Sequence, residues 1–218
     1  LKPSTEYAAQ LSYIFKRKYV ATLFFKYIED YSIQLPYQSP DELKLIFQEQ
    51  NFNYDRKIGI SLVAPFNICD WFHTRFTAQG YYEKIRTDCF HDISFTRDKF
   101  CVYGAIQNTF KVAKGLSFTL DAKGLSGALQ GIADLSSMWQ VDAGAKWSFA
   151  KDNCCELNLK IDDIFNTWSP VMRIDYKTQN YRMAVNDMTR HIKLTFVYRF
   201  NGFKPKDTSI DTSRLGTK

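Results

Sequence analysis

The side chains that could do acid–base or metal chemistry are few and lie far apart in this sequence. The three histidines, His73, His91 and His191, fall on different segments, two in strand-like stretches at polar positions and one in an expected loop. Nothing in their spacing brings them together, which favours histidines facing water or a lumen over metal ligands or a catalytic base. Asp162 and Asp163 are adjacent, and neighbours in a strand point to opposite faces. A bend or turn is therefore a better interpretation of this pair than shared catalysis.

The cysteines and the familiar short motifs add no chemistry. Five cysteines are an odd number, and they show neither C-x-x-C spacing nor a nearby histidine pair, so neither a zinc site nor a disulfide framework is indicated. They are Cys69, Cys89, Cys101, Cys154 and Cys155. The sequence also lacks G-x-S-x-G, H-E-x-x-H, P-loop and G-x-G-x-x-G motifs. We expect no enzymatic activity, no cofactor and no bound metal.

Composition favours an all-β protein. The chain has 18 Phe and 13 Tyr but only 10 Gly and 6 Pro in 218 residues, a bias toward residues that suit pleated surfaces. The net charge is +6, yet Lys and Arg are scattered among acidic residues and the densest basic run is only residues 16–18, so nucleic acid is not an expected partner. No apolar run approaches the roughly 18 residues of a membrane helix, which excludes a helical membrane protein.

Hydrophobic residues alternate with polar ones along most of the chain. In residues 191–200, Ile192, Leu194, Phe196, Tyr198 and Phe200 share one face of a strand, and the other face is mostly polar. Similar segments are predicted at residues 4–16, 19–33, 51–64, 71–86, 97–111, 115–126, 133–150, 154–175 and 181–200. We therefore expect an antiparallel up-and-down sheet of about nine long strands.

Strand length favours lipid as the solvent of the apolar face. Strands of soluble proteins usually have about 5 to 6 residues and a tilted strand needs about 9 to 11 to cross a bilayer, whereas many segments here have about 12 to 17. Aromatic residues near the strand ends suit interfacial girdles. They are Tyr19, Trp71, Phe72, Trp147, Phe149, Tyr198 and Phe200. The alternative is a soluble, lipocalin-like up-and-down barrel that turns its apolar faces inward around a small apolar ligand, and alternation alone fits both.

The predicted connections alternate between short and long, as in outer-membrane barrels with short periplasmic turns and longer outer loops. Residues 16–18, 65–70, 111–115 and 151–153 are expected to be tight turns. Residues 34–50, 87–96 and 127–132 are expected to be longer, irregular loops, and residues 176–180 a hairpin tip. The turn at residues 151–153 is then periplasmic, and residues 162–181 run toward the exterior.

The two faces of the predicted strands define two sets of candidate residues. The lumen-facing polar set mixes both signs of charge and comprises Asp142, Lys146, Glu156, Lys160, Asp162, Lys193 and Arg199. The lipid-facing set comprises Leu116, Phe118, Leu120, Leu157, Leu159, Ile161, Ile192, Leu194, Phe196, Tyr198 and Phe200.

Three stretches together resemble one family. They are residues 65–68 followed by Trp71, LNLKIDDIFNT from Leu157 to Thr167, and LTFVYRF from Leu194 to Phe200 with DTSRLG from Asp211 to Gly216. In order and spacing they are similar to the C-terminal part of the barrel in Bacteroidetes-type TonB-dependent outer-membrane receptors. The resemblance covers essentially the whole chain, and the matching motifs are structural, so it implies no specific ligand-binding residue.

The resemblance implies a location in the cell outer membrane and a role in ligand uptake. Residues 1–200 would be a C-terminal segment of the barrel and residues 201–218 a mobile polar tail. The chain starts at Leu1 without Met or a signal peptide, which favours a fragment. Barrels that hold a plug have about 22 strands, so further strands and a plug are expected upstream. The other implied partners are outer-membrane lipid, a TonB-type energy-coupling complex and the barrel-assembly machinery, which would read the terminal Phe200.

Overall fold

The computed structural model describes residues 1–39, 42–184 and 188–200, and these form two antiparallel sheets. The large sheet contains, in order, β1 (Thr5–Phe15), β2 (Tyr19–Gln38), β3 (Leu45–Cys69), β4 (Phe72–Phe90), β5 (Ile93–Ala113), β6 (Leu116–Leu125), β9 (Met138–Phe149), β10 (Cys155–Asp162) and β13 (His191–Tyr198). The small sheet contains β12 (Gln179–Ala184), β11 (Val171–Tyr176), β8 (Ala133–Leu135) and β7 (Ala128–Gln130). The predicted all-β, up-and-down sheet of nine strands is confirmed.

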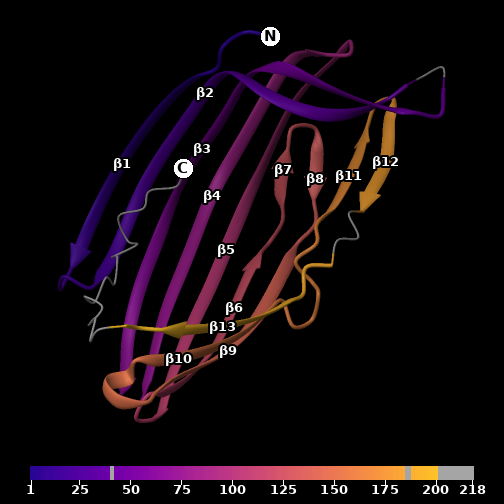
Figure 1. Cartoon of the computed structure of the whole chain (residues 1–218). Helices are drawn as coiled ribbons and strands as arrows, with labels where there is room; N and C mark the ends of the chain where they lie inside the picture. The colour runs from indigo at the N-terminus through magenta and orange to yellow at the C-terminus, as the bar shows by residue number, and fades with distance from the viewer. Residues whose placement is uncertain (40–41, 185–187, 201–218) are drawn as a thin grey trace.

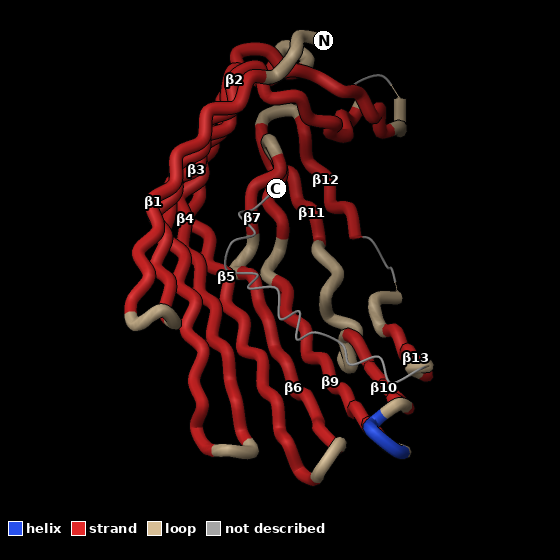
Figure 2. The backbone as a smooth tube through the Cα atoms, turned by 60° about the vertical axis from the view of Figure 1, so that its left-hand side comes forward, coloured by secondary structure: helices blue, strands red, loops and turns tan. Residues whose placement is uncertain are grey.

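The large sheet curves, and the small sheet stands on its concave side (Figures 1 and 2). Four tight connections lie at one end of the large sheet, which we call the turn end: β1–β2, β3–β4, β5–β6 and β9–β10. The opposite end, the hairpin end, carries the β2–β3 and β4–β5 hairpins and the small sheet. No helix in the described part of the chain is long and apolar enough to span a membrane.

Most of the tight turns are confirmed, but the one expected at residues 65–70 is wrong. Strand β3 continues through Pro65 to Cys69, with a register shift between Asn67 and Cys69. Pro65 is tolerated because the ladder between β2 and β3 ends at Val63, so the edge beyond it has no partner that needs a backbone N–H. The turn between β5 and β6 is likewise shorter than expected, since β5 runs to Ala113.

The long irregular loops expected at residues 34–50 and 87–96 are wrong as well. Residues 34–38 and 45–50 are a paired extension of β2 and β3, and residues 87–90 and 93–96 extend β4 and β5 to a tight turn at residues 91–92. Three predicted strands are in turn too long: residues 133–150 divide into β8 and β9, residues 154–175 into β10 and β11, and residues 181–200 into β12 and β13. Each of these segments contributes one strand to the large sheet and one to the small sheet. The alternation of apolar and polar residues in the sequence does not show where one strand ends and the next begins. The hairpin tip at residues 176–180 is confirmed.

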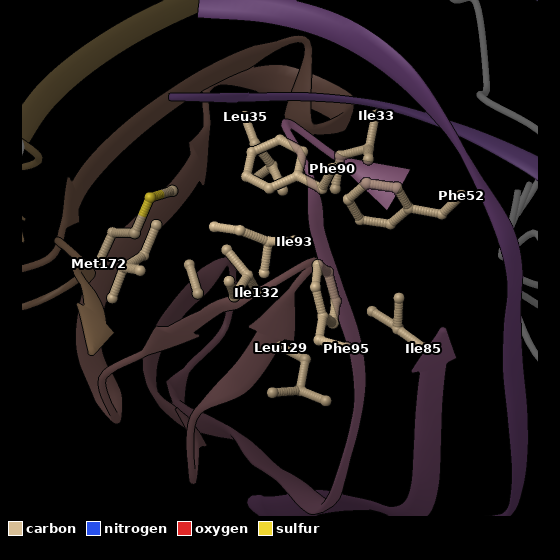
Figure 3. Close-up of a cluster of buried hydrophobic side chains, with 12 residues drawn as sticks. Ile33, Leu35, Phe52, Ile85, Phe90, Ile93, Phe95, Leu129, Ile132 and Met172 are labelled. Atoms are coloured by element: carbon tan, nitrogen blue, oxygen red, sulfur yellow. The ribbon is translucent and has the colours of Figure 1, made fainter. Parts of the chain in front are cut away.

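A hydrophobic core between the two sheets explains the extended hairpins. Its buried members are Ile33, Leu35, Phe52, Ile85, Phe90, Ile93, Phe95, Leu129, Ile132, Ala133, Met172 and Ile174 (Figure 3). The Phe52 ring meets those of Phe90 and Phe95 edge-on, with centroids 5.9 and 5.3 Å apart. Gly131 turns the β7–β8 hairpin with φ +60°, and a β-carbon there would collide with Leu35. Burial of the concave side chains therefore keeps these segments extended.

Replacing Phe52 with alanine should loosen the small sheet. Phe52 is 1% exposed, and truncating a buried Phe costs about 3–5 kcal/mol. We expect faster amide hydrogen exchange in β7, β8 and β11 of the protein in detergent micelles. Phe47→Ala is the matched control, because Phe47 lies on the same strand but is 54% exposed. Equal exchange in the two variants would contradict the assigned core.

Candidate functional site

The convex face of the large sheet carries a band of exposed apolar side chains. On β5 the convex positions from Phe100 to Phe110 are apolar or glycine except Asn108, which accepts a 2.8 Å hydrogen bond from the Thr74 hydroxyl. This stretch matches the roughly 9 to 11 residues that a tilted strand needs to cross a bilayer. Phe100 is 63% exposed. Leu194, on the same face of the edge strand β13, is 67% exposed.

Both edges of this band are marked by a change of side chain. Toward the hairpin end, the next cross-strand row on β3, β4 and β5 consists of Arg56, Lys84 and Asp98. Toward the turn end, aromatic rings gather in pairs, such as Phe72 and Phe110 stacked at 4.8 Å. All seven aromatic residues expected at strand ends lie in this region: Tyr19, Trp71, Phe72, Trp147, Phe149, Tyr198 and Phe200. The convex face thus has a charged limit and an aromatic limit, as a bilayer-spanning surface does.

The residues expected to face lipid fall into aligned rows on the convex face. The pairing register aligns Leu116, Leu157 and Phe196 through Trp147; Phe118, Leu159 and Leu194 through Ala145; and Leu120, Ile161 and Ile192 through Ala143. Tyr198 pairs with Cys155, and Phe200 follows β13 with its ring 4.6 Å from that of Tyr198.

The residues expected to face a lumen all lie on the concave face, where the structure joins several of them. Glu156 accepts a 2.7 Å hydrogen bond from Arg199, and its carboxylate is 3.1 Å from the Lys146 ammonium. Lys160 pairs with Asp162 at 2.6 Å. The two remaining members are separate: Asp142 accepts from Gln140 and from the backbone N–H of Asp163, and Lys193 lies beside Lys160 in the register.

Sequence reasoning missed a buried ionic cluster on β3 and β4. The Lys57 ammonium lies 3.3 Å from Asp55 and 3.0 Å from Glu83, and both carboxylates are almost fully buried. The Oδ1 atom of Asp55 has no hydrogen-bond partner among the described residues. Charged residues at alternate positions of β3 were the available signal, but only the strand register shows that Glu83 lies opposite Lys57. The cluster lies on the concave face, away from the apolar band.

A second missed cluster attaches the small sheet to the large one. Asp134 of β8 accepts hydrogen bonds from Lys99, at 2.9 Å, and from Arg97, both on β5. Burial by itself would raise the pKa of Asp134, but the hydrogen bond from Lys99 and the charge of Arg97 outweigh it and hold that pKa below its ordinary value. Asp134 therefore stays ionised and ties β8 to the wall.

Asp163 organises the segment after β10, which confirms its expected role in a bend. Its backbone has a positive φ of 48°, and its side chain is fully buried. The carboxylate accepts from the backbone N–H groups of Thr167, at 3.0 Å, and Trp168, at 2.9 Å, and from the Thr189 hydroxyl ahead of β13. Burial would raise the pKa of Asp163, but the hydrogen bonds from Thr167, Thr189 and Trp168 together lower it.

The remaining candidates do not assemble into a site. The Nδ1 atom of His73 lies 2.9 Å from Oδ1 of Asn67. His91, in the β4–β5 turn, stacks on Tyr37 of β2, and His191 is the first residue of β13. The five cysteines are free thiols, with the sulfurs of Cys154 and Cys155 3.9 Å apart. In the part of the chain that the structure describes, no group of three or more His, Cys, Asp or Glu residues is arranged to hold a metal ion.

Asp163→Asn should open the segment that joins β10 to β11. An amide offers one acceptor oxygen where the carboxylate offers two, and its NH₂ group would face donors, at a cost of about 1–3 kcal/mol. We expect faster hydrogen exchange at the Thr167 and Trp168 amides. Asp162→Asn is the matched control, because that carboxylate is partly exposed and, among the described residues, forms an ion pair with Lys160 alone. Unchanged exchange in Asp163→Asn would contradict this role.

Acid should have the same effect in the native chain. The folded-state pKa of Asp163 is lowered, so its contribution is complete above the ordinary Asp value of about 3.9 and is lost as the pH falls through the folded-state pKa. Protection of the Thr167 amide, measured relative to its intrinsic exchange rate at each pH, should therefore fall below about pH 4, and the Asp163→Asn variant should not show this step.

Comparison with known proteins agrees with the geometry of the two faces. No curated protein and no solved structure matches the chain. A family model described as the outer membrane protein beta-barrel family matches residues 1–198, nearly the whole chain. This places the protein in the cell outer membrane, where the apolar convex band contacts lipid. The chain belongs to the outer membrane protein beta-barrel family.

Proposed function

We propose that the chain is the C-terminal part of the barrel wall of a TonB-dependent outer-membrane receptor that takes up a ligand. The observation that carries the proposal is the contrast between the two faces. The convex face is an apolar band with aromatic and charged limits, and the concave face is lined by ion pairs such as Lys146–Glu156. A wall that separates lipid from a wet lumen needs this contrast. In this role the chain has no catalytic residues, and the turn end faces the periplasm.

The direction of the edge strands supports a wall that is completed by other strands. In the nine-stranded antiparallel sheet, β1 and β13 are the two edges and run in the same direction. They cannot pair antiparallel with each other, so closure requires an odd number of additional antiparallel strands. A barrel of about 22 strands meets this condition, because about 13 would remain to be supplied. The lumen of such a barrel has room for a plug and for its coupling to a TonB-type complex.

The soluble, lipocalin-like alternative is not supported. Such a barrel turns its apolar side chains inward around a ligand. Here the apolar side chains between the turn end and Phe100 point outward from the curve, and charged side chains point inward. The family match also favours the membrane.

Opposite faces of one strand should respond oppositely to a new charge. Leu62 lies on the convex face in the middle of the band, and its neighbour Ser61 lies on the concave face. An arginine at the lipid-facing midplane of a barrel costs about 2–4 kcal/mol. We expect Leu62→Arg to reduce sharply the amount of assembled protein in outer-membrane fractions, measured by heat-modifiable mobility on gels. Ser61→Arg should assemble nearly normally, and equal loss in both variants would reject the assignment of the two faces.

Energy-coupled uptake requires a separate experiment with the intact protein in cells. To identify the ligand, the gene is deleted and the medium is analysed for solutes that the cells no longer remove. We expect their uptake to stop when the TonB-type complex is deleted or a protonophore is added, with the level of assembled protein unchanged. Uptake that persists under both conditions would reject the TonB-dependent role, and the absence of any depleted solute would favour a non-transporting scaffold.

A further inference from the structure

The small sheet carries two arginines directly opposite each other. Arg173 of β11 pairs with Arg182 of β12 in the register, and on its other side Arg173 pairs with Asp134 of β8. Like charges directly opposite each other destabilise an antiparallel pair. None of the ion pairs among the described residues involves Arg173 or Arg182. The fold therefore tolerates a repulsion that its own described carboxylates do not relieve.

The carboxylate that pairs with Arg173 in the register is already committed to other cations. Both oxygens of Asp134 are engaged, one by Lys99 at 2.9 Å and the other by Arg97. Asp134 therefore offers little compensation to Arg173. The row that runs from Arg182 through Arg173 to Asp134 is left with an excess of positive charge.

These arginines line a cavity of about 420 Å³ between the small sheet and strand β5. Its polar lining includes Lys99, Arg173, Arg182, three serines and one carboxylate, Asp134, whose oxygens are held by Lys99 and Arg97. Two of the serines have their oxygens occupied as acceptors, Ser126 from the Val102 N–H and Ser136 from the Val171 N–H, each at 2.9 Å. Their hydroxyl protons are thus available to donate. Guanidinium, ammonium and hydroxyl donors around one cavity are what an oxyanion requires.

We propose that this cavity binds a small anionic ligand through a carboxylate or phosphate group, with Arg173 and Arg182 as the two anchoring cations. The proposal deepens the proposed function, on which it rests for the passage of the ligand through the lumen. Binding itself does not depend on TonB coupling. An anion between the two guanidiniums would neutralise their repulsion and accept hydrogen bonds from both.

Calorimetric titration of the intact protein in detergent micelles, at low ionic strength, tests the proposal. The probes are inorganic phosphate for the phosphate group and citrate for the carboxylate group. We expect at least one probe to bind and its affinity to fall at least tenfold in Arg173→Gln and in Arg182→Gln. Arg86→Gln is the matched control, because it removes the same charge from an exposed arginine that pairs with Asp88 away from the cavity. Binding of one probe alone supports the proposal and identifies the group.

Thermal unfolding gives a second readout that separates binding from folding. Removing either arginine relieves the repulsion, so both variants should unfold at the native temperature or higher in the absence of anion. The binding probe should raise the unfolding temperature of the native protein and of Arg86→Gln but not of the two cavity variants. Failure of the native protein to bind either probe, or equal weakening in Arg86→Gln, would overturn the anion site. Neither outcome would bear on uptake measured in cells, so the two proposals fail separately.

Discussion

The structure depends on one constraint: successive side chains of each strand must suit two different solvents. In the spanning region, lipid lies on one side and polar or charged side chains on the other, as Leu62 and Ser61 illustrate on neighbouring positions of β3. The backbone ladder satisfies the N–H and C=O groups between strands, which is obligatory where no water is present. A shift of one residue in any pairing would turn charges such as Lys57 and Glu83 toward lipid. The register is therefore strongly determined in this part of the sheet.

The same strands meet a third environment beyond the apolar band. On β4, the convex position Tyr82 ends the band, Lys84 begins the charged limit, and the concave Ile85 enters the core with the small sheet. Polar and apolar faces thus exchange sides along a single strand. This exchange lets β2 to β5 extend well past the bilayer without becoming irregular, because their concave side chains are buried there.

Charged groups fix the position of the small sheet relative to the large sheet, because hydrophobic contacts in the core are not directional. Asp134 connects it to β5 through Lys99 and Arg97, and Asp163 orders the chain that leads into β11. Each carboxylate is matched by several donors, which is the condition under which buried charge is tolerated. Arg173 and Arg182 break this pattern, since these two exposed arginines face each other and form no ion pair among the described residues. Such a local conflict in a well-matched framework is characteristic of a binding position.

Alternation by itself determined the all-β class, the nine-stranded sheet, the two faces and the aromatic limit, because period two is a local property of the backbone. The resemblance of residues such as 157–167 to an outer-membrane barrel agreed with the family match. The predicted tail at residues 201–218 lies outside the described residues. Only the tertiary structure decided that residues 34–38 and 45–50 are strand, that β11 and β12 leave the wall, and that Lys57 meets Glu83. These features arise from contacts between segments distant in the chain, and a local pattern contains no information about which segments meet.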